Sequence, residues 1–114
     1  MAPTTLLGMK TSTSPAGRTV ETAGYPLKMA DLVAMLPGTY YVSRHAVNTP
    51  NAVRQLKKAI MRSFQYQKEE KGTCFIEVVS ACPSGWKKTP LQAKQWLEES
   101  MFKQFPPGEL KAPK

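Results

Sequence analysis

The apolar positions of this chain follow an extended pattern in two segments and a helical pattern between them. Residues 40–47 and 73–80 are rich in aromatic and β-branched side chains, which favour strands. The second run is almost continuously apolar, as in a parallel strand that is buried on both faces. Between them a helix is predicted from Pro50 to about Lys68, with Thr49 as its N-cap. Two strands joined by a helix form a βαβ unit, so we expect them to be parallel.

Shorter helices are predicted on either side of this unit. One begins at Pro26 and ends near Leu36. Another begins after Thr89, where Gln92 is placed to complete a capping box. Each of the three predicted helices has an apolar face, formed in turn by Met29, Leu32, Val33 and Leu36, by Val53, Leu56, Ile60 and Phe64, and by Ala93, Trp96, Leu97 and Met101.

Composition divides the chain into three regions. Residues 1–24 are rich in Thr, Ser, Gly and Pro and are expected to form a loop that lies over other parts of the protein. Residues 25–105 carry the predicted α/β elements, and residues 106–114 are expected to be irregular. Two parallel strands are fewer than the roughly 4–6 of a stable sheet. We therefore predict the C-terminal portion of a doubly wound parallel α/β domain whose first half lies elsewhere. Alternatively, a partner chain supplies the missing strands.

The chain is basic, with 16 Lys and Arg against 8 Asp and Glu and a net charge of +8. Such a charge attracts nucleic acid, acidic membrane surfaces and acidic proteins. Arg54, Lys58 and Arg62 lie opposite the apolar face of the middle helix, where they form either a solvated face or a docking surface for an acidic partner. Aromatic residues are only weakly interleaved with these cations, which disfavours nucleic acid. A small basic nucleic-acid-binding or interaction module without catalysis nevertheless stays open as the alternative function.

Membrane and secretory signals are not predicted. No run approaches the roughly 18 apolar residues that a membrane span needs. The first ten residues lack the basic and apolar regions of a secretory signal, so a cytoplasmic location and no membrane partner are expected.

Candidate chemistry centres on few residues. His45 is the only histidine, and no spacing in the chain indicates a catalytic triad, so its role stays open. Cys82 follows the second predicted strand, and the carboxyl ends of parallel strands are where α/β sheets build their sites. Its thiolate is a candidate nucleophile or metal ligand, beside the simpler alternative of an inert cysteine. Cys74 lies at the strand's other end, too distant to form a disulfide with Cys82, and is expected only to pack.

Four segments in order carry a resemblance to a known family. They are MAPTT at 1–5, TSTSPAG at 11–17, GYP at 24–26 and EVVSACPSGW at 77–86. Together they resemble the end of the β subunit of 2-oxoacid:ferredoxin oxidoreductases, in the branch that acts on 2-oxoglutarate or 2-oxoisovalerate. The resemblance covers about residues 1–110.

This resemblance implies an enzyme part and a set of cofactors. The family's β subunit carries a doubly wound thiamine-diphosphate-binding domain with Mg²⁺. The enzymes oxidatively decarboxylate a 2-oxoacid to an acyl-CoA and pass electrons through a 4Fe-4S cluster to ferredoxin. By the same resemblance, Cys82 corresponds to the last cluster ligand, and Thr4 and Thr5 lie beside the thiamine site.

Much of the family pattern is missing from the chain. The other three cluster cysteines, the Gly-Asp-Gly segment and downstream Asn that hold magnesium, and the Thr-Gly-Gly-Gln turn are not present. We therefore expect none of these cofactors to bind the chain alone, and no catalysis by it. The expected partners are the N-terminal half of the same subunit, the α and other subunits, and ferredoxin.

Overall fold

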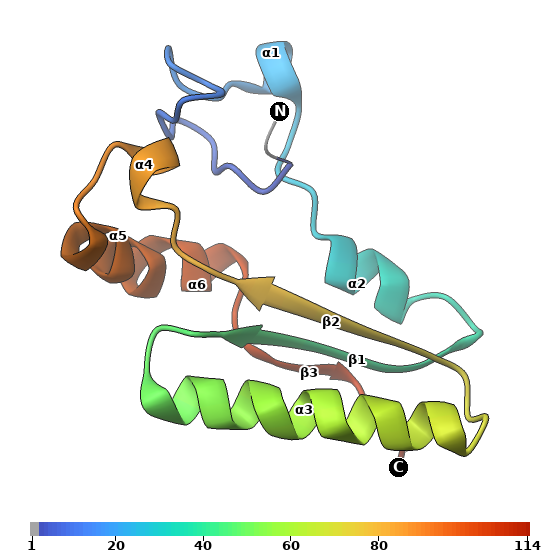
Figure 1. Cartoon of the computed structure of the whole chain (residues 1–114). Helices are drawn as coiled ribbons and strands as arrows, with labels where there is room; N and C mark the ends of the chain where they lie inside the picture. The colour runs from blue at the N-terminus through green and yellow to red at the C-terminus, as the bar shows by residue number, and fades with distance from the viewer. Residues whose placement is uncertain (1–2) are drawn as a thin grey trace.

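The computed structural model describes residues 3–114, so Met1 and Ala2 of the predicted loop lie outside the described residues. The predicted succession of helix, strand, helix, strand and helix is confirmed (Figure 1). Three short elements, α1, α4 and β3, are present in addition. The elements are α1 (Val20–Ala23), α2 (Met29–Ala34), β1 (Thr39–Ala46), α3 (Pro50–Lys68), β2 (Thr73–Val79), α4 (Pro83–Trp86), α5 (Pro90–Trp96), the π-helical turn η1 (Leu97–Met101), α6 (Phe102–Gln104) and β3 (Gly108–Lys111).

Two predicted helix starts are confirmed by their capping contacts. The backbone N–H of Ala52 donates to the Thr49 hydroxyl over 3.1 Å, and Pro50 occupies the first turn of α3. At α5 the Gln92 N–H donates to the Thr89 hydroxyl, and the Thr89 N–H donates to the Gln92 side chain. Both contacts satisfy N–H groups that a helix leaves unpaired at its first turn.

The strands form one sheet in the order β2-β1-β3 (Figure 1). β1 and β2 are parallel, with Arg44 beside Glu77 in the register, which confirms the predicted parallel pair and the α/β class. β3 is antiparallel to β1. The expectation of an irregular tail over 106–114 is therefore wrong at Gly108–Lys111, because these residues find a pairing partner far away in the sequence.

A cluster of buried apolar side chains lies at the carboxyl end of β2. Figure 1 shows α3 along one face of the sheet and α2 over the other, while α4, α5 and α6 lie beyond the arrowhead of β2. Four buried residues form the core cluster there, with Leu6, Trp86, Trp96 and Phe102 packed against them: Val79, Leu97, Met101 and Phe105. This confirms the predicted apolar face of the last helix.

The other predicted apolar faces are not covered within residues 3–114. Met29, Leu32 and Leu36 of the first predicted helix are exposed, and so are Val53, Ile60 and Phe64 of α3. Instead α3 buries Ala59 against the sheet. Arg62, predicted on the polar face, lies over the Tyr41 ring at 5.7 Å and pairs with Glu109. Part of the polar face of α3 therefore turns toward the sheet.

The second strand also differs from the expectation of burial on both faces. Of the seven residues of β2 only Val79 is buried, and β2 pairs with β1 alone. Its outer edge therefore has no neighbouring strand among residues 3–114. Cys74 and Cys82 are both free, as predicted. No helix in the described part of the chain is long and apolar enough to cross a membrane.

Candidate functional site

A cavity of about 310 Å³ opens at the carboxyl end of β2, between the N-terminal loop and α4. It brings together all three residues that the sequence singled out, Thr4, Thr5 and Cys82. Its lining comprises Thr4, Thr5, Met9, Thr11, Ser12, Thr13, Glu77, Val78, Val79, Ser80, Cys82, Gly85, Trp86, Met101 and Phe105. The wall is thus polar on the loop side and apolar where it meets the core cluster.

Cys82 stands at the rim of this cavity because the chain turns sharply after β2. It is the N-cap residue of α4, and Pro83 occupies the first helical position. Pro83 lacks an N–H, which costs nothing at that position. A Cβ at Gly85 would lie 2.8 Å from the Cys82 sulfur, so only glycine leaves the sulfur its place. The thiol-bearing residue is exposed and can reach a group outside the chain.

The Thr- and Ser-rich loop is fastened to this turn by backbone hydrogen bonds. The Ser12 N–H donates to the Gly85 carbonyl over 2.9 Å. Within the loop, the Gly8 N–H donates to Arg18 and the Arg18 N–H donates to Met9, which ties its two arms together. The predicted loop therefore does lie over another part of the protein, and the part it covers is the Cys82 turn.

Arg18 organises the loop from within. It is only 4% exposed. Its guanidinium donates to the carbonyls of Gly24 and Ala23 at 3.0 Å, of Tyr25 at 3.1 Å and of Pro3 at 3.3 Å. Five donors in a rigid fork suit such a set of carbonyls. The contact to Pro3 holds the start of the loop, directly before Thr4.

Thr4 and Thr5 follow that anchored residue and face the cavity together. Thr4 is half-buried and Thr5 is 5% exposed. No described residue hydrogen-bonds to the Thr5 hydroxyl, although the residue is buried. A hydroxyl both donates and accepts, so Thr5 has its hydrogen-bonding capacity available to a molecule in the cavity.

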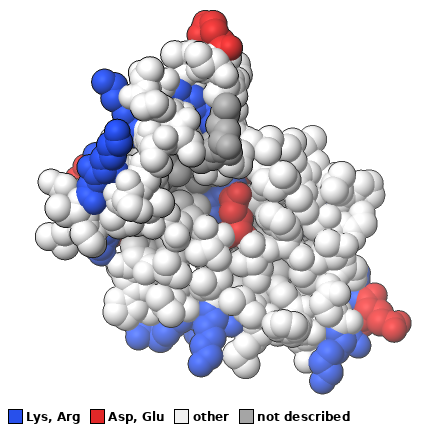
Figure 2. Space-filling model, turned by 45° about the horizontal axis from the view of Figure 1, so that its top comes forward, with Lys and Arg blue, Asp and Glu red and all other residues white. Residues whose placement is uncertain are grey.

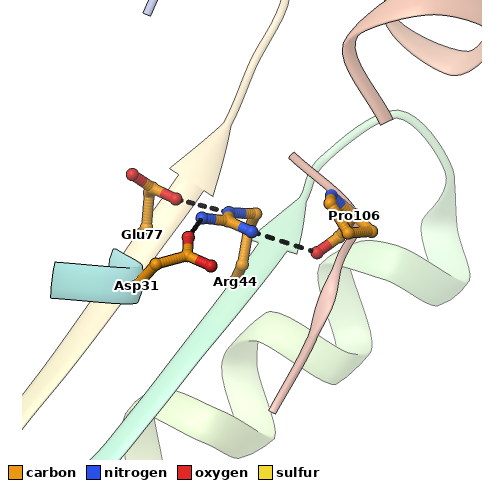
Figure 3. A network of polar contacts seen from close by, with 4 residues as sticks. All are labelled: Asp31, Arg44, Glu77 and Pro106. Carbon is orange, nitrogen blue, oxygen red and sulfur yellow. Dashed lines mark hydrogen bonds and ion pairs between the residues drawn. The ribbon is translucent and has the colours of Figure 1, made fainter. Parts of the chain in front are cut away.

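A buried ion network supports the cavity from the sheet (Figure 3). Arg44 of β1 is 2% exposed and donates to Glu77 over 2.5 Å and to Asp31 over 2.6 Å. It also reaches the Pro106 carbonyl at 3.5 Å. Burial lowers the pKa of Arg44, but the hydrogen bonds to Glu77 and Asp31 outweigh this and raise it above its ordinary value. Since Glu77 also lines the cavity, the network fixes the position of its carboxylate.

His45 belongs to a different cavity, of about 440 Å³, which Tyr41, Arg62 and Glu109 also line. Its ring nitrogen Nε2 lies 3.0 Å from the Ser43 hydroxyl. Burial is the largest cause that lowers the pKa of His45. The charge of Glu109 raises this pKa by a smaller amount, and the charge of Arg62 lowers it further. The structure thus separates the single histidine from the Cys82 cavity.

Several residues of the site carry no clear sequence signal. Arg18 lies in a loop that has no hydrophobic periodicity. Its partners are backbone carbonyls, which are present at every residue, so the sequence does not indicate which ones it binds. Arg44 and Glu77 had a usable signal, since each is a charge inside a segment with a strand pattern. Charges in buried strands are usually paired, so they could have been matched.

Proteins similar to this chain include two subunits named ketoisovalerate oxidoreductase subunit VorA, from Methanothermobacter marburgensis and Methanothermobacter thermautotrophicus. They are 39% and 40% identical to it over 106 residues, which is 93% of this chain and 22% of each subunit. The 2-oxoglutarate synthase subunit KorB of Archaeoglobus fulgidus is 34% identical over 100 residues, 88% of this chain and 33% of that subunit. No family model matches the chain, and no solved structure matches it significantly. The chain thus spans about a fifth of VorA and a third of KorB.

Proposed function

We propose that this chain is the C-terminal part of the thiamine-diphosphate-binding β subunit of a 2-oxoacid:ferredoxin oxidoreductase. The chain is homologous to a segment of subunits of such enzymes, as its motifs predict. The complete enzyme works in the cytoplasm and converts a 2-oxoacid to an acyl-CoA while it reduces ferredoxin. This activity requires the chain, the rest of its subunit, the α subunit and the other subunits. The chain alone is inactive.

The observation that carries this proposal is the cavity that joins Thr4 and Thr5 to Cys82. These residues lie about 80 positions apart in the sequence, yet the docking of Ser12 on Gly85 brings their segments to one place. Cavities at the carboxyl ends of parallel strands are the usual sites of doubly wound domains. The proposed fold and the proposed cofactor site therefore agree in position.

The chemistry of the cavity fits one part of each cofactor site. Cys82 offers an exposed thiol, which as a thiolate can ligate one iron of a 4Fe-4S cluster. Thr5 offers a hydroxyl at the cavity wall that can hydrogen-bond to thiamine diphosphate. When bound, thiamine diphosphate stabilises the carbanion that decarboxylation leaves. Residues 3–114 contain no group of three or more metal-ligating side chains, so the remaining cluster ligands and the Mg²⁺ ligands come from the rest of the subunit.

The two cysteines provide a matched test in the complete enzyme. Cys82→Ser is expected to lower the bound iron per enzyme and to abolish ferredoxin reduction with 2-oxoisovalerate or 2-oxoglutarate as substrate. Cys74→Ser is the control, because Cys74 lies near the start of β2 and lines a groove other than the Cys82 cavity. Equal iron content and equal activity in the two variants would remove Cys82 from the proposed cluster site.

The basic residues of α3 give ferredoxin a place to dock. Ferredoxins of these enzymes are acidic by the family resemblance, and opposite charges speed association at low salt. Of the three cations predicted to dock a partner, Arg62 is engaged by Glu109, which leaves Arg54 and Lys58. Replacing Arg54 and Lys58 by Gln should raise the KM for ferredoxin at low salt and leave the KM for the 2-oxoacid unchanged. An unchanged KM for ferredoxin would exclude this surface.

The face of the molecule that Figure 2 draws does not favour a nucleic-acid-binding module. Such a module needs a continuous basic groove or face. Figure 2 shows Lys and Arg in separate groups around the rim of the face it presents. The charge on this face therefore suits a small acidic partner better than a polyanion chain.

A further inference from the structure

The turn after β2 carries Cys82 and, three residues later, Gly85. We propose that Gly85 is a positioning residue, which fixes the side-chain orientation of Cys82 for its role as a cluster ligand. The proposal rests on the proposed function and adds how this chain holds the sulfur toward the cavity. Two sets of observations lead to it: the atoms around Gly85, and the contacts that fix the backbone of Cys82.

Gly85 differs from the other glycines of the chain. Five of them have a positive φ, a conformation that favours glycine whatever lies nearby: Gly8, Gly17, Gly24, Gly72 and Gly108. Gly38 has open space where a Cβ would stand. Gly85 lies in α4 and has no positive φ, so its backbone would accept alanine, which is the more favourable residue inside a helix. Backbone conformation therefore gives no reason for glycine at position 85.

The reason lies in the side chain that occupies the space over Gly85. A Cβ at this position would stand 2.8 Å from the Cys82 sulfur, closer than a carbon and a sulfur can approach without a bond. The next nearest atom, the hydroxyl oxygen of Ser12, would be 3.7 Å away, which is an ordinary contact distance. The loop docks through the Ser12 N–H and the Gly85 carbonyl, which alanine also has. The sulfur of Cys82 is thus the group that requires glycine.

The backbone of Cys82 is held by its other neighbours. Pro83 restricts the conformation of the residue before it, and Cys82 has φ −124° and ψ 80°. The Cys82 carbonyl accepts a hydrogen bond from the Trp86 N–H over 2.9 Å. The freedom that remains to the sulfur is rotation about the Cα–Cβ bond, which settles in staggered positions. The sulfur occupies the position over Gly85, and both residues line the cavity.

A fixed sulfur has a consequence for ligation. A ligand whose rotamer is set in advance loses no side-chain freedom when it binds a metal. Removing a group that orients a metal ligand typically lowers metal affinity by about 10–100-fold. Alanine at position 85 would drive the Cys82 sulfur out of the space over α4 and into another staggered position. We therefore expect Gly85→Ala to weaken the cluster in an enzyme that still folds.

Nuclear magnetic resonance of the 114-residue chain measures the orientation directly. Three-bond couplings to the β-protons of Cys82 report its χ1 angle. We expect a single rotamer in the wild type and a different rotamer in Gly85→Ala. Gly38→Ala is the matched control, because Gly38 also lacks a positive φ and a Cβ there meets nothing within 4 Å. The same Cys82 couplings in the wild type and in folded Gly85→Ala would overturn the proposal.

The complete oxidoreductase provides a second measurement, which does not depend on the folding of the isolated chain. Gly85→Ala should lose cluster iron to a chelator about tenfold or more faster than the wild type. It should also change the electron paramagnetic resonance spectrum of the reduced cluster, whereas Gly38→Ala should change neither. Wild-type iron loss together with a wild-type spectrum in Gly85→Ala would overturn the positioning role.

Comparison with Cys82→Ser separates this proposal from the proposed function. If Cys82→Ser removes cluster iron and Gly85→Ala does not, Cys82 is a ligand that Gly85 does not position, so the proposal fails and the proposed function stands. If Gly85→Ala reorients Cys82 in the chain while Cys82→Ser leaves the cluster of the complete enzyme intact, the steric contact is real and the proposed cluster ligand is wrong. That second result is a failure of the proposed function.

Discussion

The two ends of the parallel strand pair differ in how their apolar side chains are covered. At the carboxyl end of β2, Phe105 is 1% exposed and lies in a cluster with Val79, Leu97 and Met101. Along α3 and the outer edge of β2, Phe64 and Ile60 are exposed to solvent. Both regions come from segments with equally clear amphipathic patterns. The pattern indicates which face of an element needs cover, and only the neighbouring elements decide whether the chain itself supplies that cover.

We call the carboxyl end of β2 the closed end of the molecule, and α3 with the outer edge of β2 the open end. The candidate cavity lies at the closed end. Its floor is formed by Met101 and Phe105 of the core cluster, and its wall by the loop that Arg18 holds. The open end carries the groove beside Cys74 and Ile76. Residues 3–114 thus pack the apolar floor of the cavity themselves, while Cys82 at its rim and the outer edge of β2 stay exposed.

The strongest test of this contrast compares two phenylalanines. Phe105→Ala should destabilise the isolated chain by about 3–5 kcal/mol, because it leaves a cavity in a packed cluster. Phe64→Ala should change its stability by only about 0.5 kcal/mol or less, because the ring contributes little to the packing of this chain. Urea unfolding followed by the fluorescence of Trp86 and Trp96 measures both. Equal effects would show that the closed and open ends do not differ.

Local chemistry explains which parts of the fold were predictable. Thr49-Pro50 and Thr89-Pro90 predict helix starts correctly because a cap is satisfied within four residues. β3 was not predictable, because its four residues have no apolar alternation and their partner, β1, is distant in sequence. The orientation of Arg62 depends on the same strand, since Glu109 of β3 draws it toward the sheet.

The same reasoning applies to the candidate site. The position of Cys82 after β2 was predictable, because a strand end is a local feature; its role in a site stays a prediction. Thr4 and Thr5 were singled out only by family resemblance. Their position in the cavity depends on Arg18 and on the contact between Ser12 and Gly85, neither of which follows from a local pattern.

A smaller effect is expected from the ion network that borders the closed end. Glu77→Gln removes one carboxylate from the buried Arg44 and leaves it Asp31, whose side chain is half exposed. Losing a hydrogen bond to a charged group costs about 1.5–3 kcal/mol. Glu98→Gln is the control, because Glu98 pairs with Lys94 at the surface and such pairs contribute little. If thermal unfolding shows the same change for both variants, the Arg44 network does not stabilise the closed end.

The smallest expected effect is a pH dependence that belongs to His45. Burial lowers the pKa of His45 in the folded chain below the value of about 6.5 that it has in the unfolded chain. Between these two pKa values the unfolded chain binds more protons, so the stability of the folded chain decreases as the pH falls through this window. Hydrogen bonds from Lys94 and Asn48 lower the pKa of Glu98, so Glu98 titrates below this window.

The measurement is the melting temperature of the isolated chain between about pH 7.5 and 5.5, a range that brackets the unfolded pKa of histidine. The wild-type melting temperature should fall as the pH is lowered, and His45→Gln should remove most of this dependence. Asn48, which lines the same cavity without titrating, gives the control variant Asn48→Ala, in which the dependence should persist. A wild-type chain and a His45→Gln chain with the same pH profile would show that His45 is not buried enough to disfavour its charged form.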